Sequence, residues 1–324
     1  MLISSWAVAM NLIAIALLGF FIAALIMSCA WLLLNKFINL FSMKSQKSLV
    51  WGWVAGPWFL GLITTLLFSP LFANTFLYRW IEEVAHWHHL YVFQMSSWHG
   101  ISVILFVFFS VALISMKGWQ LYQQNSAVQV LNAFSNSHQK NYGLHNVVVL
   151  QSDVPTAFTS GLFKPKCYVS SGLINNLSDK ELDIVIQHEL AHAHKKDPLS
   201  KLFIAFLSAY YPKKIAMDLN AKYSLITEHL ADRATAIQHS AEYVASTLVK
   251  VARLQKVMPT QVQNPALSYF GANSITQRVQ QLLNPTNKSI PLLIPLSSML
   301  IMLCLTVLAV DATHHLVETI FTHS

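Results

Sequence analysis

Four long runs without a charged residue constrain this chain more than any other feature of its sequence. A helix of about 20 apolar residues crosses the hydrocarbon core of a bilayer, which is about 30 Å thick. Charged residues make up only 11% of the chain, too few to give four buried helices of this length a soluble shell. We therefore expect a multi-pass α-helical membrane protein, with transmembrane helices at about 6–34, 51–78, 96–116 and 289–310.

The charged residues gather in one region. Residues 117–288 hold 17 of the 21 Lys and Arg residues and 10 of the 14 Asp and Glu residues. This predicts three transmembrane helices in 1–117, a polar domain at 118–288, a fourth transmembrane helix at 289–310 and a short tail at 311–324. The loop after the first run carries Lys36, Lys44 and Lys47 and no acid, so the positive-inside rule places this loop and the polar domain in the cytoplasm. The predicted location is a bacterial inner membrane, with both termini outward.

The composition of the polar region argues against two kinds of site. The net charge of the chain is +7, but no basic run is interleaved with aromatic residues. Cytoplasmic topology and contact with anionic lipid therefore explain the surplus of positive charge, and direct nucleic-acid binding is not expected. The three cysteines are scattered and show no C-x-x-C spacing. Neither a disulfide framework nor a thiolate zinc site is therefore expected.

The polar region has the pattern of an α+β domain. Short runs at Asn146–Leu150, Thr156–Ser160 and Lys166–Ser170 are typical of strands. Ser178 and Glu181 form an S-x-x-E capping box, which marks the start of a long helix.

An H-E-x-x-H motif lies well inside this helix. His188 and His192 are four residues apart, so their imidazoles stack on one face and both can reach one ion. Glu189 is one step further round the helix, where it lies beside that ion and can act as a general base. The motif predicts a zinc site with metallopeptidase chemistry.

A catalytic zinc site needs a third protein ligand and an open fourth position. His194 is about 200° round the helix from His192 and faces away. The stretch Thr227–Ala234 is the better source, because Glu228 lies 36 residues beyond His192, a gap that fits one return segment and a second helix. Within it Glu228 is the leading ligand, with Asp232 accepting from a ligand imidazole. Asp232 or His229 as the ligand are the alternatives.

With these motifs the sequence resembles the BlaR/MecR-type antirepressor family of membrane zinc metallopeptidases, and more distantly the HtpX/Ste24 proteases. The matching segments are Ala157–Phe163 (AFTSGLF), Lys164–Gly172 (KPKCYVSSG), Leu177–Asp197, Glu228–Arg233 (EHLADR) and Ser274–Leu283. The sensors of that family carry an outward penicillin-binding domain after the last span. Here only the 14 residues Asp311–Ser324 follow it, so direct β-lactam sensing is not expected.

The resemblance implies an α+β gluzincin-like zinc metallopeptidase domain inserted among the transmembrane helices. It implies His188, His192 and Glu228 as ligands of Zn²⁺, Glu189 as general base and acid, and Asp232 as the supporting carboxylate. It also implies that a strand pairs with an extended substrate peptide, and this strand comprises Ala157, Phe158, Thr159 and Ser160.

These features predict a membrane zinc endopeptidase that cuts protein substrates on the cytoplasmic side. The leading substrate is a transcriptional repressor or a juxtamembrane segment. Membrane-protein quality control and a non-catalytic signalling scaffold are the alternatives. Tyr223 and Arg233 are the candidates for a second oxyanion donor. An outward loop with His86, His88 and His89, and His99 close to the next span, could sense acid or metal, or could be an ordinary polar loop.

Overall fold

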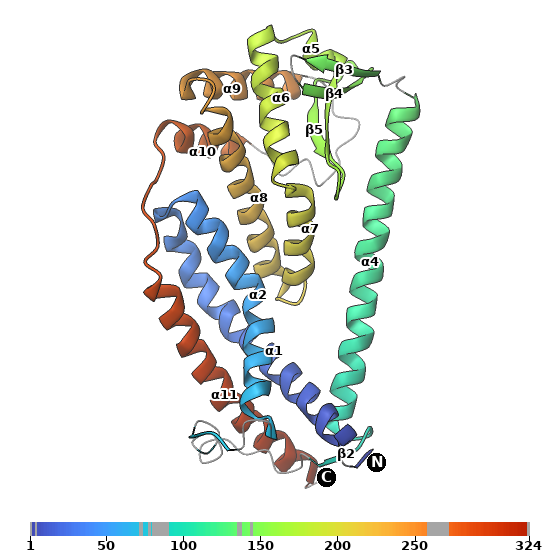
Figure 1. Ribbon diagram of the computed structural model, residues 1–324, viewed down its shortest axis with the longest axis vertical. Coiled ribbons are helices and arrows are strands. Elements are labelled where there is room, and N and C mark those ends of the chain that lie inside the picture. Colours follow the sequence, from blue (N-terminus) through green and yellow to red (C-terminus); the bar gives the residue numbers. More distant parts are fainter. Residues whose placement is uncertain are drawn as a thin grey trace.

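The computed structural model shows a bundle of long helices with a mixed helical and sheet lobe at one end (Figure 1). Both chain termini lie at the opposite end of the bundle (Figure 1). The structure describes residues 2–3, 5–70, 74–76, 79, 91–134, 138–142, 145–257 and 272–322. The loop with His86, His88 and His89 lies outside the described residues.

Among the residues that the structure describes, four helices are long and apolar enough to cross a membrane, in agreement with the four expected spans. They are α1 (Ser5–Phe37), α2 (Met43–Leu67), α4 (Trp98–Phe134) and α11 (Leu293–Thr322). A short 3₁₀ helix, Ile38–Leu40, follows α1. A two-stranded ribbon of β1 (Leu2–Ile3) and β2 (Val92–Phe93) lies near the termini.

Three of the four helices have ends that differ from those of the expected runs. Helix α2 starts and ends earlier than the expected 51–78, because Ser42 caps its first turn by accepting from the backbone N–H of Ser45, and the helix ends at Leu67, shortly before Pro70. Helix α4 runs without a break from the third span to Phe134, well beyond the expected end at residue 116. Helix α11 extends to Thr322, so most of the expected tail is helical.

The described residues of the lobe form one four-stranded sheet. Its strands are β3 (His138–Tyr142), β4 (His145–Leu150), β5 (Ala157–Ser160) and β6 (Lys166–Ser170), in the order β3-β4-β6-β5. Strand β6 is parallel to β4 and antiparallel to β5. Strands β4, β5 and β6 confirm the expected runs, whereas β3 has the polar sequence HQKNY and was not expected. Strand β5 forms one edge of the sheet.

In the described part of the chain, six helices complete the lobe. They are α5 (Ser171–Ile174), α6 (Asp179–His194), α7 (Asp197–Ser208), α8 (Lys213–Thr235), α9 (Ala241–Val257) and α10 (Ala272–Leu283). The expected capping box is present at the start of α6, where Ser178 and Glu181 satisfy each other's backbone N–H groups. Helix α6 packs against β5, β6 and α8, so it lies at the centre of the lobe.

The lobe and the membrane helices share one hydrophobic core. Ile204 on α7 and Leu219 on α8 are fully buried in the same cluster as Trp31 on α1. Tyr211, between α7 and α8, donates to the backbone carbonyl of Trp53 at 2.6 Å, and the Trp53 indole donates to the carbonyl of Met27 at 3.1 Å. The apolar stretch Leu202–Tyr211, which cannot span a bilayer by itself, therefore packs on the membrane helices.

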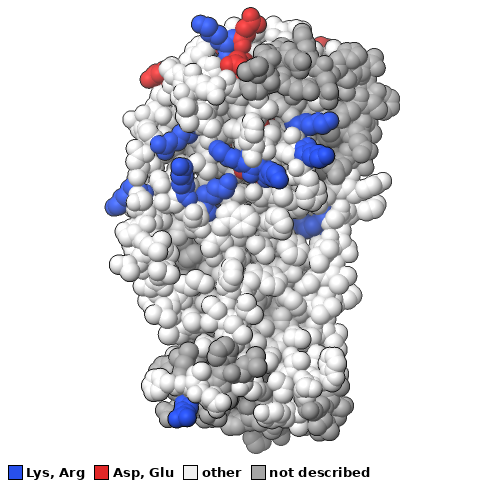
Figure 2. All heavy atoms as spheres, viewed as in Figure 1, with Lys and Arg blue, Asp and Glu red and all other residues white. Residues whose placement is uncertain are grey.

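Charge is segregated along the bundle. On the face shown in Figure 2, Lys and Arg side chains gather over the upper half, which holds the lobe, while the lower half is almost free of them. The segment between α1 and α2 and the segment before α11 meet at the boundary between the two halves, where the backbone N–H of Ser42 donates to the carbonyl of Lys288 at 2.8 Å. The division into 1–117, 118–288, 289–310 and 311–324 remains a prediction, although α4 crosses its first boundary without a break.

Candidate metal centre and active site

Helices α6 and α8 bring together the two imidazoles of the H-E-x-x-H motif and one carboxylate. His188 Nε2 lies 3.2 Å from His192 Nε2 and 3.3 Å from Glu228 Oε2, and His192 Nε2 lies 3.4 Å from Glu228 Oε1. A tetrahedral zinc site with metal–ligand bonds of about 2.0–2.1 Å has edges of about 3.3 Å. The three ligand atoms therefore already have the spacing that Zn²⁺ requires.

Two further carboxylates contact the opposite edges of the imidazoles. His192 Nδ1 lies 2.8 Å from Asp197 Oδ2, and His188 Nδ1 lies 3.0 Å from Asp232 Oδ1. When Nδ1 carries the proton in each ring, both Nε2 lone pairs converge with the Glu228 carboxylate on one point. Converging lone pairs repel unless a cation lies between them. The donor set therefore fits a metal ion.

Asp197 is a part of the site that sequence analysis missed. It follows the end of α6, and Lys196 between the two helices adopts a left-handed conformation with φ of 50°. This turn starts α7 and folds Asp197 back onto His192. Spacing along a continuous helix cannot reveal such a contact, because the contact depends on the break in the helix.

Arg278 on α10 completes the polar cluster and was also not singled out. Its Nη2 and Nε donate to the two oxygens of Asp232 at 2.6 and 2.8 Å, and its Nη1 lies 3.5 Å from Glu228 Oε2. The side chain of Arg278 is only 12% exposed, and that of Asp232 is 1% exposed. Arg278 thus holds Asp232 in position beside His188 while Asp232 offsets its charge.

The electrostatics of the cluster favour added positive charge. Burial lowers the pKa of His192, but contacts with Asp197 and Glu228 outweigh it and raise the pKa to about 9. The pKa of His188 is also raised, since its contacts with Asp232 and Glu228 outweigh burial. The pKa of Glu228 is held well below its usual value by the imidazoles, against the effect of burial. Three acids around two imidazoles thus attract a cation.

Glu189 lies where the edge strand of the sheet meets α6. The Thr159 hydroxyl on β5 lies 2.9 Å from Glu189 Oε2 and 2.7 Å from the Glu189 backbone carbonyl, and its single proton can serve one of them at a time. Ala157, Phe158, Thr159 and Ser160 form β5, which pairs with β6 on one side only in the described sheet. The predicted substrate strand is therefore an edge strand beside the predicted catalytic carboxylate.

The other candidate residues lie elsewhere. His194 is exposed on the far side of α6. His229 is buried and lines a cavity of about 650 Å³, together with residues of α1, α2 and α10, away from the two imidazoles. Tyr223 accepts a hydrogen bond from the Trp51 indole at 3.2 Å, and Arg233 contacts Asn287 at 3.5 Å. The structure thus groups Glu228, and not His229, with the motif, and Asp232 lies on the outer edge of His188.

Comparison with known proteins gives the family of this chain. The sequence model of peptidase family M48 matches residues 121–285, which is half of the chain and includes every residue of the cluster. The chain belongs to peptidase family M48. Over 65 residues it is 35% identical to Protease HtpX homolog 2 of Methanosarcina mazei, a match that covers 19% of this chain and 22% of that protein. The similarity therefore spans about a fifth of the length of this relative.

Membership of this family defines the general class of the protein. M48 proteins are peptidases and are generally zinc-dependent, and this chain has four helices that could cross a membrane. The chain is thus a membrane protein of a metallopeptidase family, with a His-His-Glu group that could hold a metal ion.

Proposed function

We propose that this protein is an integral-membrane zinc endopeptidase in which His188, His192 and Glu228 hold the ion and Glu189 acts as general base and acid. The observation that carries the proposal is the convergence of three ligand atoms at 3.2–3.4 Å, with a carboxylate at the outer edge of each imidazole. A chance cluster of polar side chains has no reason to bring three zinc-type ligand atoms to this spacing.

Each residue of the cluster has a defined task. When bound, zinc lowers the pKa of a coordinated water to about 7 and polarises the scissile carbonyl. Glu189 accepts the proton of the attacking water and later gives it to the leaving amine. Asp197 and Asp232 hold the imidazoles in the tautomer that ligates through Nε2. Arg278 keeps Asp232 ionised and in place.

The position of β5 suggests how a substrate binds. An extended peptide can add to the free edge of β5 through backbone hydrogen bonds, which do not depend on side-chain identity. The Thr159 contact with Glu189 ties this edge to the catalytic carboxylate. A peptide on Ala157–Ser160 would therefore run past Glu189, as an endopeptidase requires.

We further propose that the lobe faces the cytoplasm of a bacterial inner membrane, with both termini outward. The lysines of the first loop support this orientation, because Lys47 lies 3.6 Å from Asp197 and so belongs to the same side as the metal centre. Within this topology a BlaR/MecR-type role, regulated cleavage of a transcriptional repressor, is the leading function. The resemblance of the 157–197 and 228–233 segments supports it.

The test compares the full-length protein with Glu189→Gln in detergent, by zinc analysis and by cleavage of an unfolded test protein. We expect about one zinc at His188, His192 and Glu228 in both proteins, and a loss of cleavage of about 10²–10⁴-fold in the variant. Asp183→Asn is the matched control, since it removes one negative charge from the exposed face of the same helix and should cut normally. Equal cleavage by wild type and Glu189→Gln would exclude this enzymatic mechanism.

Two alternatives give different results in the same digests. Quality control predicts cleavage of many unrelated membrane proteins, whereas regulated proteolysis predicts one or a few cuts in a bacterial extract. A signalling scaffold predicts a zinc-loaded wild type that cuts nothing. The retained Glu189 argues against the scaffold, because a purely structural zinc site has no use for a free carboxylate beside the ion.

A further inference from the structure

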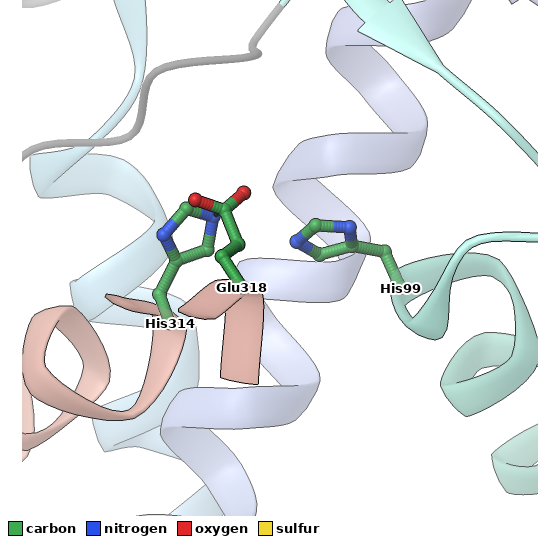
Figure 3. A group of neighbouring side chains, drawn as sticks. All are labelled: His99, His314 and Glu318. Atoms are coloured by element: carbon green, nitrogen blue, oxygen red, sulfur yellow. Dashed lines mark ion pairs between the residues drawn. The ribbon is translucent and has the colours of Figure 1, made fainter. Parts of the chain in front are cut away.

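A second group of potential metal ligands lies at the end of the bundle that holds the termini, opposite the peptidase site. It comprises His99 in the first turn of α4, and His314 and Glu318 near the end of α11. Figure 3 shows His314 and Glu318 side by side on one helix, with the His99 ring facing them from the other. Two helices that are far apart in the sequence thus contribute to one group.

The ligand atoms converge. One atom from each residue lies within 4.8 Å of the others, and His314 Nε2 lies 3.2 Å from Glu318 Oε1. The ring centroids of His99 and His314 are 5.5 Å apart, and the indole of Trp98 lies against the His99 ring at 3.8 Å. Small side-chain rotations would bring the three atoms to the edge length of about 3.3 Å that a tetrahedral zinc site needs.

Burial separates this group from an ordinary polar helix end. His314 is completely buried, His99 is 8% exposed, and both belong to helices that could cross a membrane. Ionisable residues within such helices are costly and mark ion, proton or ligand sites. The adjacent His315 has the same i, i+4 arrangement with Asp311, at 3.5 Å, but its side chain is 47% exposed. Only the buried pair meets a third ligand from another helix among the described residues.

We propose that His99, His314 and Glu318 form a second binding site for a divalent transition-metal ion, with Zn²⁺ as the expected ion. Two imidazoles and one carboxylate are a ligand set that zinc accepts. Imidazole nitrogen favours zinc and its neighbours over Mg²⁺ and Ca²⁺, which prefer oxygen ligands.

An ion at this site would join two helices, α4 and α11, that connect to different elements of the lobe. Helix α4 leads into the strands of the sheet that includes β5, and α11 follows α10, which carries Arg278. Both α4 and α11 pack on α1. Occupancy would therefore fix the spacing of α4 and α11 at the end of the bundle that holds the termini.

The test counts zinc in the full-length protein in detergent, after stripping with a chelator and reloading with Zn²⁺ at a defined free concentration. Glu318→Gln and His99→Gln remove one ligand of the proposed site, and His188→Ala removes one of the peptidase site. His315→Gln is the matched control on the same helix. We expect about two zinc ions per chain in wild type and in the control, and about one in each of the other three variants.

A second measurement protects the test against poor folding of a variant. In the His188→Ala background, Zn²⁺ should still raise the melting temperature, and adding Glu318→Gln should abolish this rise. A His188→Ala protein that binds no zinc and does not respond to it would overturn the proposal. So would a wild type with a single zinc that His99→Gln and Glu318→Gln both retain. Neither result would affect the assignment at His188 and Glu228, which is read from the loss of zinc in His188→Ala.

Discussion

The buried pair of Arg278 and Asp232 offers the sharpest test of how the metal centre is held together. Arg278→Met replaces a guanidinium that makes two contacts with Asp232, at 2.6 and 2.8 Å, by an apolar side chain of similar length. Asp232 is 1% exposed and cannot recover its hydrogen bonds from water. Removing one partner of a buried pair costs about 3–5 kcal/mol.

The loss should be visible in the melting temperature of the zinc-free, full-length protein in detergent. At about 2–4 °C for each kcal/mol, the expected fall is roughly 6–20 °C. Arg233→Met is the control, because Arg233 lies on the exposed face of α8, and its change should stay within about 0.5 kcal/mol. Arg278→Lys keeps the charge but loses the two-point contact, so it should fall between the two.

A double variant separates the effect of the Arg278–Asp232 pair on stability from the effect of Asp232 on zinc binding. Asp232→Asn with Arg278→Met removes both charges, so its melting temperature should lie above the value expected from adding the two single losses. Its zinc affinity should be low, as in Asp232→Asn alone, because that substitution removes the carboxylate at His188 Nδ1. If Arg278→Met melts like Arg233→Met, or if the two losses simply add, the pair does not hold the site as we describe.

Two further predictions concern residues around the same helices. Asp197→Asn should weaken zinc binding by about 10–100-fold in a chelator competition, because it removes the charge at His192 Nδ1, and an unchanged affinity would contradict that role. Burial is the main reason that the pKa of His229 is lowered from 6.5 to about 4. The folded chain therefore binds a proton at His229 less readily than the unfolded chain does. As the pH falls from 6.5 towards 4, this difference should lower the free energy of unfolding by up to about 3 kcal/mol. The melting temperature of His229→Gln should therefore fall less over this range than that of wild type, and parallel curves would refute the argument.

The sequence was most informative where a local pattern determines the geometry. The spacing of His188 and His192 and the capping box at Ser178 each depend on one helix, and both are present as expected. The number of membrane helices follows from run length alone, but their ends do not. Ser42 starts α2 among lysines, where hydropathy gives no signal.

The site residues that the sequence did not reveal depend on contacts between different helices. Asp197 reaches His192 only because the chain turns at Lys196, and Arg278 reaches Asp232 from a helix that follows more than 40 residues later. No spacing rule connects these pairs. Sequence analysis favoured Glu228 over the adjacent His229, and the face of α8 that points towards α6 carries Glu228 into the group with His188 and His192.

The shared core of α7, α8 and the first two membrane helices affects how the protein can be handled. Ile204, Leu219 and Tyr211 would all be exposed to water if the lobe were expressed without α1 and α2. Lys47, which approaches Asp197 from α2, would be lost as well. Truncation to the lobe alone would thus produce a destabilised protein that is prone to aggregate. Inhibitor screening should therefore start from the intact chain in detergent or nanodiscs.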